Sequence, residues 1–498
     1  MPRTDAAAMH RLILLSLLCL VHTLGAADTL RIGSKRFTES YILAEVLAQT
    51  AAPHTATEVK AGLGNTAIVY AALRAGSIDL YPEYAGTIDQ EILKNDTPSP
   101  SLAAMRAQLQ PLGLGVDIAL GFNDGYALAM RADVAKKLGI VKLSDLAKHP
   151  DLRLGLSNEF IGRADGWGGL AKRYALPQKP TGLDHGLAYD AVTKAQVDVI
   201  DIYTTDAKIK HLGLTVLSDD GAYFPRYDAV VLYRLDVPTR FPAAWKALQA
   251  RAGRIDEAAM IAMNARAELQ SVAFDKIARD HLQGGAKTEE KRGFLAKLFG
   301  PDLARLAWQH LSLVTVSVAL AVLIGVPLAV AVAPHDRARA IALGATGLLQ
   351  TIPALALLAA LISLVDRIGS VPALLALTLY ALLPIMRNTC TGLAEVPAGL
   401  KTAGAALGLT AAQCLRFIEL PLALPTIVAG IRTATSIAVG TATIAAFIGA
   451  GGLGERIVTG LALNDKELLL AGALPSAALA LAFEGLFGVL ALCWKKPV

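Results

Sequence analysis

The segment Gly399-Leu-Lys-Thr-Ala-Gly-Ala-Ala-Leu-Gly408, which continues to Ile418-Glu-Leu-Pro421, is a polar interruption between two strongly apolar stretches. Gly408 suits the end of a short helix, because glycine readily adopts the left-handed backbone that ends helices. Pro421 suits the first turn of the next helix, where its missing N–H has no partner to lose. The pattern predicts a helix–turn–helix over 399–421. An ordinary loop between two membrane spans is the simpler alternative.

The composition divides the chain into two unlike parts. Hydrophobic residues make up 54% of the 498 residues and charged residues 18%, below the roughly 25% typical of soluble proteins. Residues 28–300 have an ordinary soluble composition, whereas residues 303–494 are dominated by Ala, Leu, Val, Ile and Gly. The net charge is +5 without a long Lys/Arg run, so no nucleic-acid partner is indicated.

The C-terminal part contains apolar segments long enough to be membrane spans, because a bilayer core needs about 20 apolar residues of helix. These segments cover roughly 311–333, 341–365, 371–386, 422–448 and 468–493. The second is interrupted by Gln350-Thr-Ile-Pro353, and the last contains Glu484, an acid that is a functional candidate inside a membrane. We predict an all-α polytopic membrane domain over 303–494, with five spans favoured.

The basic residues of the connecting segments predict the orientation. With the soluble part outside, 334–340, 387–421 and 494–498 face the cytoplasm. These segments hold Arg337, Arg339, Arg387, Lys401, Arg416, Lys495 and Lys496. The outer loops hold only Arg367, Arg456 and Lys466, each beside an acid. This positive-inside asymmetry places 399–421 in the cytoplasm.

The spacing of Gly408, Ile418 and Leu420-Pro421 resembles the cytoplasmic coupling segment of ABC importer permeases. The strings Gln350–Ala354, Tyr380–Asn388 and Phe447–Gly454 resemble the same family. The resemblance implies a type-1 permease fold and a short helix that docks into a separate ATPase subunit. It carries that role onto Thr402, Ala403, Gly404, Gly408, Ile418, Leu420 and Pro421. The family usually has Glu-Ala-Ala where this chain has Thr402-Ala403-Gly404, so the contact of the glutamate is not carried over.

The N-terminus predicts export of the soluble part. Arg3 and Arg11 precede the apolar run 12–21, and the small residues 25–27 follow it. This is the pattern of a signal peptide over 1–27, with an uncleaved anchor as the alternative. None of the four cysteines lies between residues 28 and 300, so disulfides do not stabilise the exported part.

The exported part alternates short apolar strands with helices, which favours an α/β fold with largely parallel sheets. Strands are expected at 30–33, 78–80, 153–156 and 197–200, and helices at 39–50 and 65–75. Its length predicts two lobes, with chain crossings near 120 and 225 and a ligand in the cleft between the lobes.

Four strings of the exported part resemble the glycine betaine/choline/carnitine binding proteins of osmoprotectant importers. They are Gly33–Glu39, Leu80–Thr87, Asp124–Ala129 and Val199–Asp206, and the similarity runs over most of residues 29–282. The resemblance implies a two-lobed, type II periplasmic-binding-protein fold. The chain is then a signal peptide (1–27), a binding domain (28–282), a linker (283–302) and a permease (303–494).

The same resemblance implies how a ligand is held. A trimethylammonium group has no N–H to donate, but aromatic faces attract it through their negative quadrupoles. The family's cage of four tyrosines maps to Tyr84, Tyr126, Tyr203 and Tyr227, with the backbone carbonyl of Asp124 beside it. A ligand carboxylate is expected on Lys35, Thr87 and Arg163. Asp79 and Glu83 are expected to stabilise the local turn, and His185 and His211 to be surface residues.

The sequence also predicts partners. No G-x-x-x-x-G-K-[ST] string occurs, so a separate ABC ATPase is expected to hydrolyse ATP. About five spans need a second permease half, so we expect a homodimer in membrane lipid. No catalytic constellation, metal site or cofactor is indicated. The favoured function is an importer of glycine betaine or a related quaternary amine at the cytoplasmic membrane. An importer of another betaine, such as ergothioneine, and a ligand sensor are the alternatives.

Overall fold

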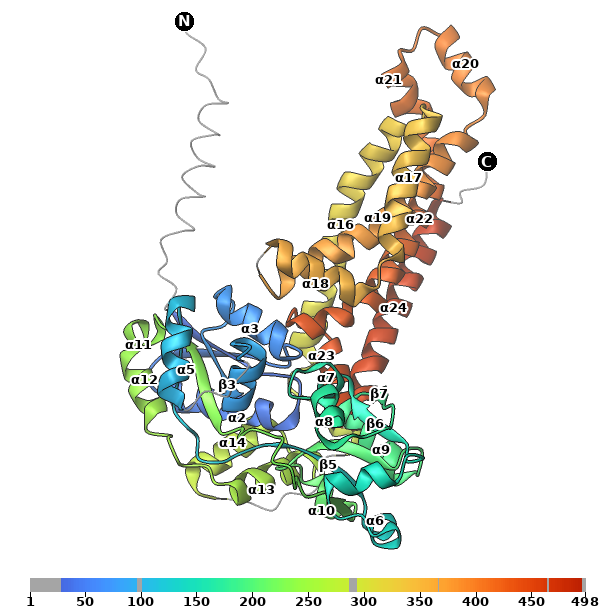
Figure 1. Cartoon of the computed structure of the whole chain (residues 1–498). Coiled ribbons are helices and arrows are strands. Elements are labelled where there is room, and N and C mark those ends of the chain that lie inside the picture. The colour runs from blue at the N-terminus through green and yellow to red at the C-terminus, as the bar shows by residue number, and fades with distance from the viewer. Residues whose placement is uncertain (1–27, 96–100, 286–292, 366, 464, 495–498) are drawn as a thin grey trace, which may run out of the picture.

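The computed structural model of the chain describes residues 28–95, 101–285, 293–365, 367–463 and 465–494. The predicted signal peptide and residues 286–292 of the predicted linker lie outside the described residues. An α/β body forms the exported half, and a bundle of long helices rises from it (Figure 1).

The first lobe is built on a five-stranded sheet with the order β2-β1-β3-β10-β4. Its strands are β1 (Thr29–Gly33), β2 (Ala56–Lys60), β3 (Leu80–Tyr84), β4 (Leu114–Asp117) and β10 (Ala229–Arg234). β1 pairs in parallel with β2 and β3, whereas β10 runs antiparallel to β3 and β4. The expected strand at 78–80 therefore begins only at Leu80, and the sheet is mixed rather than wholly parallel.

The second lobe repeats this arrangement with the order β7-β6-β8-β5-β9. Its strands are β5 (Tyr126–Arg131), β6 (Leu154–Ser157), β7 (Thr181–Leu183), β8 (Val199–Tyr203) and β9 (Leu214–Val216). β5 is antiparallel to β8 and β9. The chain crosses between the lobes over 118–125 and 217–228, as predicted.

Helices cover both sheets, and their apolar faces supply the core. The larger ones are α2 (Thr38–Ala51), α3 (Thr66–Arg74), α5 (Leu102–Leu109), α6 (Ala132–Leu138), α8 (Trp167–Tyr174), α9 (His185–Thr193), α12 (Pro242–Gln249), α13 (Glu257–Glu268) and α14 (Phe274–Gln283). α2 and α3 begin and end within a residue or two of the predicted ranges. Ile42 and Leu47 of α2 are fully buried, so this helix anchors the first lobe.

The membrane half has four helices that are long and apolar enough to cross a bilayer, within the described part of the chain. They are α16 (Leu303–Val332), α19 (Ser370–Glu395), a helical stretch over Ala411–Ala442 that ends in α22 (Leu420–Ala442), and α24 (Lys466–Trp494). α19 lies centrally, packing on α16, α17 (Asp336–Thr351) and α22. The predicted span 371–386 was too short, because α19 continues to Glu395. The predicted span 422–448 was too long, because a separate turn, η5 (Ile444–Ile448), follows α22.

The fifth predicted span is a bent pair of helices. α17 and α18 (Ala354–Val365) meet at 102°, at the break that Gln350–Pro353 predicted. Non-helical backbone inside a membrane needs partners from the protein. α19 provides them: the Tyr380 hydroxyl donates to the Ile352 carbonyl (2.5 Å), and the Gln350 amide donates to the Tyr380 carbonyl (2.8 Å). Hydrogen bonds to α19 therefore stabilise the break between α17 and α18.

The exported half rests on the outer ends of the membrane helices. The glycine-rich string ending at Gly454 forms a turn, with positive φ at Gly449, Gly451 and Gly452. A Cβ at Gly449 would collide with Leu63 of the first lobe, so only glycine permits this approach. Helix α23 (Gly454–Leu463) follows and packs on α9 of the second lobe.

Candidate ligand-binding site

The four predicted tyrosines reach the cleft from strand ends. Tyr84 is the last residue of β3 and Tyr203 the last of β8, whereas Tyr126 is the first of the antiparallel β5. Tyr126 and Tyr203 are direct partners in the ladder between β5 and β8. Tyr227 precedes β10, in the second crossing between the lobes. Ligands of open α/β sheets bind at this edge, outside the carboxyl ends of the parallel strands.

The rings of these tyrosines pack around one point. The ring centroid of Tyr126 lies 5.1 Å from that of Tyr203 and 5.7 Å from that of Tyr227. A fifth ring, Phe37 at the start of α2, lies 5.2 Å from Tyr203 and 6.1 Å from Tyr84. We call these five residues the aromatic cage. The sequence reasoning missed Phe37, although an aromatic residue two positions after Lys35 was a usable signal.

The aromatic cage encloses a cavity of about 20 Å³. Lys35, Thr87, Asp124 and Glu159 complete its wall. The space suits about one water molecule. A group as large as trimethylammonium therefore requires the rings, and the lobes that carry them, to move apart.

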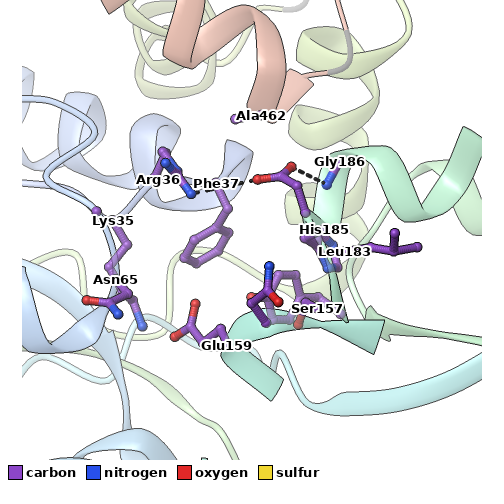
Figure 2. Close-up of a pocket in the computed structure, with 14 residues that line it drawn as sticks. Lys35, Arg36, Phe37, Asn65, Ser157, Glu159, Leu183, His185, Gly186 and Ala462 are labelled. Atoms are coloured by element: carbon purple, nitrogen blue, oxygen red, sulfur yellow. Dashed lines mark hydrogen bonds and ion pairs between the residues drawn. The ribbon is translucent and has the colours of Figure 1, made fainter. Parts of the chain in front are cut away.

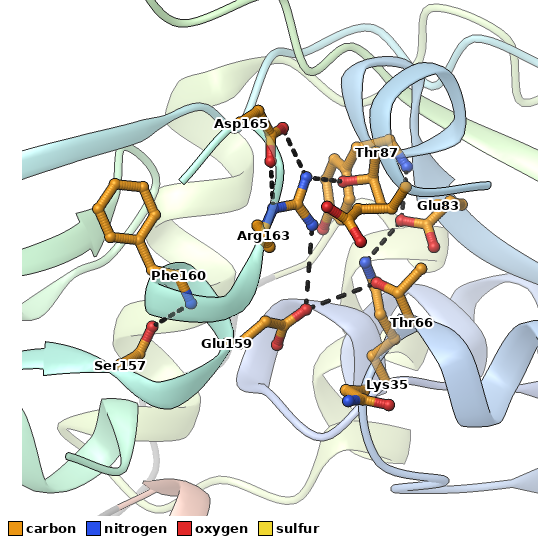
Figure 3. Close-up of polar contacts among 12 residues, drawn as sticks. Lys35, Thr66, Glu83, Thr87, Ser157, Glu159, Phe160, Arg163 and Asp165 are labelled. Atoms are coloured by element: carbon orange, nitrogen blue, oxygen red, sulfur yellow. Dashed lines mark hydrogen bonds and ion pairs between the residues drawn. The ribbon is translucent and has the colours of Figure 1, made fainter. Parts of the chain in front are cut away.

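Figure 3 shows the three residues predicted for a ligand carboxylate: Lys35 and Thr87 line the cage cavity, and Arg163 is hydrogen-bonded to Thr87. Arg163, just after α7 (Asn158–Gly162), donates from Nη2 to the hydroxyl of Thr87 across the cleft (3.4 Å). Its guanidinium carbon lies 5.1 Å from the ring centroid of Tyr126. The Lys35 ammonium lies 5.0 Å from the ring centroid of Tyr84. Each cation thus lies over one ring of the cage.

Both cations already have carboxylate partners inside the protein, which the sequence did not predict. Arg163 binds Asp165 in a bidentate pair, Nε to Oδ1 and Nη2 to Oδ2, each at 2.7 Å. The Tyr227 hydroxyl donates to the same carboxylate (2.6 Å). Lys35 donates from Nζ to Oε1 of Glu83 (2.5 Å), and the backbone N–H of Tyr84 donates to the same oxygen (2.9 Å). Glu83 therefore holds Lys35 in place as well as its own turn. These partners hold both cations in place, because charge-assisted bonds are strong and directional.

A buried acidic network lies behind Tyr84. The Tyr84 hydroxyl and the Thr205 hydroxyl donate to Glu39 at 2.5 and 2.6 Å. The Thr205 hydroxyl oxygen also lies 2.9 Å from Oδ1 of Asp124, and the Thr205 backbone N–H donates to the same Oδ1 (3.2 Å). Burial raises the pKa of Glu39 to about 7, and burial together with the nearby Glu39 raises the pKa of Asp124 well above its usual range. A cation in the cage would favour the charged forms of both acids.

His185 is not the surface residue that the sequence suggested. Its ring lies 4.4 Å from the ring centroid of Tyr203, and its side chain is 22% exposed. Nε2 is bonded to Asp206 (3.2 Å), and Nδ1 faces Asp201 at 3.9 Å. Burial alone would lower the pKa of His185, but Asp201 and Asp206 raise it to about 10. The imidazolium therefore supports Tyr203 from behind. His211 is exposed, as expected.

A second cavity, of about 110 Å³, separates the aromatic cage from the membrane half (Figure 2). Phe37, Tyr203, Lys35 and Glu159 line both cavities. Ala462 of α23 lines the far side. We call this space the antechamber. Beside it, Arg36 bridges the lobes to Asp184 (3.7 Å) and lies over the ring of Phe447 in the membrane half, 4.7 Å from its centroid.

The predicted coupling segment lies at the opposite end of the bundle from the exported half (Figure 1). It comprises α20 (Ala398–Ala406), a turn at Gly408 with φ +85°, α21 (Ala411–Cys414) and the turn η4 (Leu415–Glu419). Leu420 and Pro421 open α22. The helix–turn–helix prediction is confirmed, whereas docking to an ATPase stays a prediction.

Side chains hold this segment in shape and leave an apolar tip. Gly404 is buried, and a Cβ there would come within 2.7 Å of the Ile418 side chain. Thr402 and Ala403 face solvent on α20. Leu407 is 83% exposed and Phe417 61% exposed.

Two family models match the chain. The substrate-binding domain of the ABC-type glycine betaine transport system matches residues 28–284. The binding-protein-dependent transport system inner membrane component matches residues 321–492. Both describe parts of transporters rather than enzymes.

Curated relatives match one or both halves. The osmoprotectant import permease protein OsmW of Salmonella typhimurium is 47% identical over 188 residues, covering 37% of this chain and 87% of that protein. The choline transport system permease protein OpuBB of Bacillus subtilis is 41% identical over 190 residues, covering 38% of this chain and 87% of that protein. The ergothioneine transport permease/ergothioneine binding protein EgtU of Helicobacter pylori is 31% identical over 290 residues, covering 56% of this chain and 52% of that protein.

The raised pKa of His185 predicts a pH-dependent contribution to stability. Because the folded pKa is about 10 and the unfolded value about 6.5, the stabilisation is complete below pH 6.5 and is lost as the pH rises toward 10. The stability advantage of the wild-type exported half over His185→Gln should therefore shrink between pH 6.5 and 10. The difference in the free energy of unfolding is measured by urea denaturation at each pH, monitored through the fluorescence of the buried Trp167 and Trp245. His211→Gln is the control, and an advantage that does not change with pH would contradict a charged His185.

Proposed function

The chain belongs to the substrate-binding-domain family of the ABC-type glycine betaine transport system, with a transport-system inner membrane component fused behind it, and we propose that it captures glycine betaine or a related quaternary amine and passes it inward. It is a multi-pass inner-membrane protein whose binding domain is of the periplasmic type. We assign residues 28–282 to the binding domain, 283–302 to the linker and 303–494 to the permease.

The aromatic cage is the observation that carries the choice of ligand. Five rings converge on it: three from strand ends, Tyr227 from the second crossing between the lobes, and Phe37 from the start of α2. Each face attracts a desolvated quaternary ammonium by about 0.5–2 kcal/mol. Glu159 in the wall and the acidic network behind Tyr84 add negative potential without requiring an N–H donor on the ligand.

The opposite end of the cage suits the carboxylate of a betaine. Lys35, Thr87 and Arg163 meet there, and their internal partners leave part of each donor set free. Arg163 uses Nε and Nη2 for Asp165, while its Nη1 lies 4.0 Å from Glu159, beyond hydrogen-bond length. A ligand carboxylate would take this position in place of the weak contacts to Glu159 and Thr87.

Lobe movement follows from the size of the cavity. The contacts that cross the cleft include Thr66 to Glu159 (3.5 Å) and the backbone of Ala164 to Glu91 (3.0 Å). Other contacts cross the cleft in its interior, such as Arg163 to Thr87 (3.4 Å) and Thr205 to Glu39 (2.6 Å). These bonds break when the lobes separate to admit a ligand and form again when the lobes close over it. The antechamber then offers the ligand a route toward α23 when the lobes reopen.

Ergothioneine, a betaine with its own trimethylammonium group, is the second candidate ligand. The similarity to EgtU supports it, since that protein is named as both permease and binding protein. The aromatic cage accepts the ammonium of either compound. The carboxylate end accepts either carboxylate, so a competition assay with both compounds decides between them.

Transport needs energy that this chain does not supply itself. We assign ATP hydrolysis to a separate ABC ATPase that docks on α20 through Thr402, Ala403 and the apolar tip at Leu407. Gly408, Ile418, Leu420 and Pro421 shape the segment rather than contact the partner. A ligand shifts a conformational equilibrium only by its differential affinity for two states, so binding alone cannot drive accumulation. We also assign a homodimer in the lipid bilayer, because one chain has too few spans for a closed path.

Removing one ring of the aromatic cage should weaken ligand binding. Tyr203→Ala and Phe37→Ala should each lose about 1–2 kcal/mol, from one cation–π face and the apolar area around it. Isothermal titration calorimetry with glycine betaine and choline measures the loss. Tyr203→Phe keeps the ring face and should bind within a few-fold of wild type. Unchanged affinity in both alanine variants would contradict the cage.

The two ends of the ligand should respond differently to Arg163. Arg163→Ala should weaken glycine betaine more than choline, because only betaine has a carboxylate that loses a charge-assisted bond. The ratio of the two affinities is the measurement, and it is insensitive to a general loss of folded protein. Asp165→Asn, which keeps the guanidinium, should change this ratio less. Equal losses for both ligands would mean that Arg163 supports only the fold of the cleft.

Breaking α20 should uncouple transport from binding. Ala403→Pro removes a backbone donor inside the helix and costs about 3 kcal/mol of helix stability. Ala398→Pro is the matched control, because Ala398 is the first helical residue and its N–H has no intrahelical partner. Uptake of labelled betaine by proteoliposomes with the ATPase should be lost in Ala403→Pro and kept in Ala398→Pro, while both bind ligand normally. Full uptake by Ala403→Pro, or accumulation without an ATPase, would refute the coupling assignment.

A further inference from the structure

Glu159 is an acid in the wall of the aromatic cage, and its contacts with the described residues are long. It is the second residue of α7 and lines both the cage cavity and the antechamber. The Thr66 hydroxyl donates to its Oε1 at 3.5 Å, and Nη1 of Arg163 lies 4.0 Å from the same oxygen (Figure 3). Strong hydrogen bonds to a carboxylate are shorter, at roughly 2.5–2.9 Å. The Glu159 carboxylate therefore keeps acceptor capacity for another partner.

The other acids beside the cage have closer partners. Glu83 and Asp165 accept hydrogen bonds from the two cations at 2.5 and 2.7 Å. Asp124 lies 2.9 Å from the Thr205 hydroxyl oxygen. Among the described residues, Asp124 and Glu159 are the acids that line the cage cavity. Glu159 has the longer contacts of the two, so it is the acid better able to bond to a ligand.

Glu159 lies where the two cavities adjoin. Phe37, Tyr203 and Lys35 line both cavities together with it (Figure 2). The cage cavity has a volume of about 20 Å³, whereas the antechamber has about 110 Å³. A chemical arm attached to an ammonium group in the cage therefore finds more room toward the antechamber, and it passes Glu159 on the way.

The cations that line the antechamber do not favour an anionic arm there. Lys35, Arg36 and His185 each have a carboxylate partner other than Glu159, at 2.5, 3.7 and 3.2 Å. An anionic arm would meet these paired cations and also the Glu159 carboxylate, which repels it because the two charges have the same sign. An uncharged hydrogen-bond donor meets no such repulsion.

Occupation of the cleft changes the surroundings of the Glu159 carboxylate. The Glu159 side chain is 31% exposed, so water can solvate it while the cleft is empty. A ligand that fills the cleft removes this solvation, and a carboxylate left without a donor then costs free energy. A hydroxyl or N–H group on the ligand replaces the lost hydrogen bonds, whereas an alkyl group does not. Sites of this kind reject ligands that lack the matching donor.

We propose that Glu159 is a specificity-determining residue, which selects quaternary amines that carry a hydroxyl or N–H donor, and that the antechamber holds the arm with this donor. The inference rests on the proposed function, because it requires a quaternary ammonium in the aromatic cage. It narrows the ligand class from quaternary amines in general to those with a donor beside the ammonium. Choline has such a donor, and glycine betaine does not.

Two ligands that differ only in a hydroxyl group test the role of Glu159. Choline has the hydroxyl and ethyltrimethylammonium lacks it, and isothermal titration calorimetry of the full chain in nanodiscs measures both dissociation constants. The wild type should prefer choline on the order of tenfold, because the acceptor is charged but partly exposed. Glu159→Gln should reduce this preference, and Glu159→Ala, which removes the acceptor, should abolish it. In both variants glycine betaine should gain affinity relative to ethyltrimethylammonium, since its carboxylate is no longer repelled.

Glu91→Gln is the matched control. Glu91 also contacts the opposite lobe, through the backbone N–H of Ala164 at 3.0 Å, but it lines neither cavity. This variant loses one charge and one contact across the cleft, and its preference for choline should equal that of the wild type. A choline preference that Glu159→Ala leaves unchanged, with all three ligands still bound, would overturn the role of Glu159 and leave the proposed function intact. Wild-type chains that bind no quaternary amine would defeat the proposed function and the role of Glu159 together.

Discussion

The antiparallel pairing of β5 with β8 is the contact on which the binding half depends. It sets Tyr126 directly opposite Tyr203 at the edge of the second lobe, where both rings face the first. The same edge carries Asp201 and, just beyond β8, Asp206, which fix the charged His185 behind Tyr203. A slip of one residue in this register would turn each side chain to the other face of the sheet. It would remove two cage rings and their support together.

Charged side chains of opposite sign occupy different positions around the cage. The cations Lys35 and Arg163 have fixed carboxylate partners, whereas the acids with raised pKa values lie behind Tyr84. Buried charges are held by hydrogen bonds because an unpaired one is very unfavourable in a low-dielectric interior. In the function we propose, a zwitterion between these groups would place its ammonium against the rings and its carboxylate near the two cations. Arg36 contacts Asp184 of the second lobe and Phe447 of the membrane half, so one side chain connects the cleft to the permease.

Local patterns and family resemblance foresaw the elements better than the contacts. The ends of α2 and α3, the break after Gln350 and the turn at Gly408 follow from residues close together in the sequence, so they could be predicted. The resemblance also brought the four tyrosines together. Phe37, the His185 site and the Glu83 partner of Lys35 depend on chain segments far apart in sequence. Such pairings cannot be predicted from periodicity or spacing. An isolated histidine in the sequence suggests a surface residue, and only the fold shows that two aspartates lie beside His185.

The membrane half covers polar groups at membrane depth in two different ways. At the bend between α17 and α18, freed backbone groups are satisfied within the chain by Gln350 and Tyr380. At Arg432 and Glu484 the charges are paired, yet their pair remains open on the outer face of α22 and α24. A hydrogen bond can be completed inside one copy, but exclusion of hydrocarbon from a charged pair needs a surface of protein or water on every side. The polar groups of the bend are therefore covered within one chain, whereas the Arg432 and Glu484 side chains stay 45% and 35% exposed although they are paired.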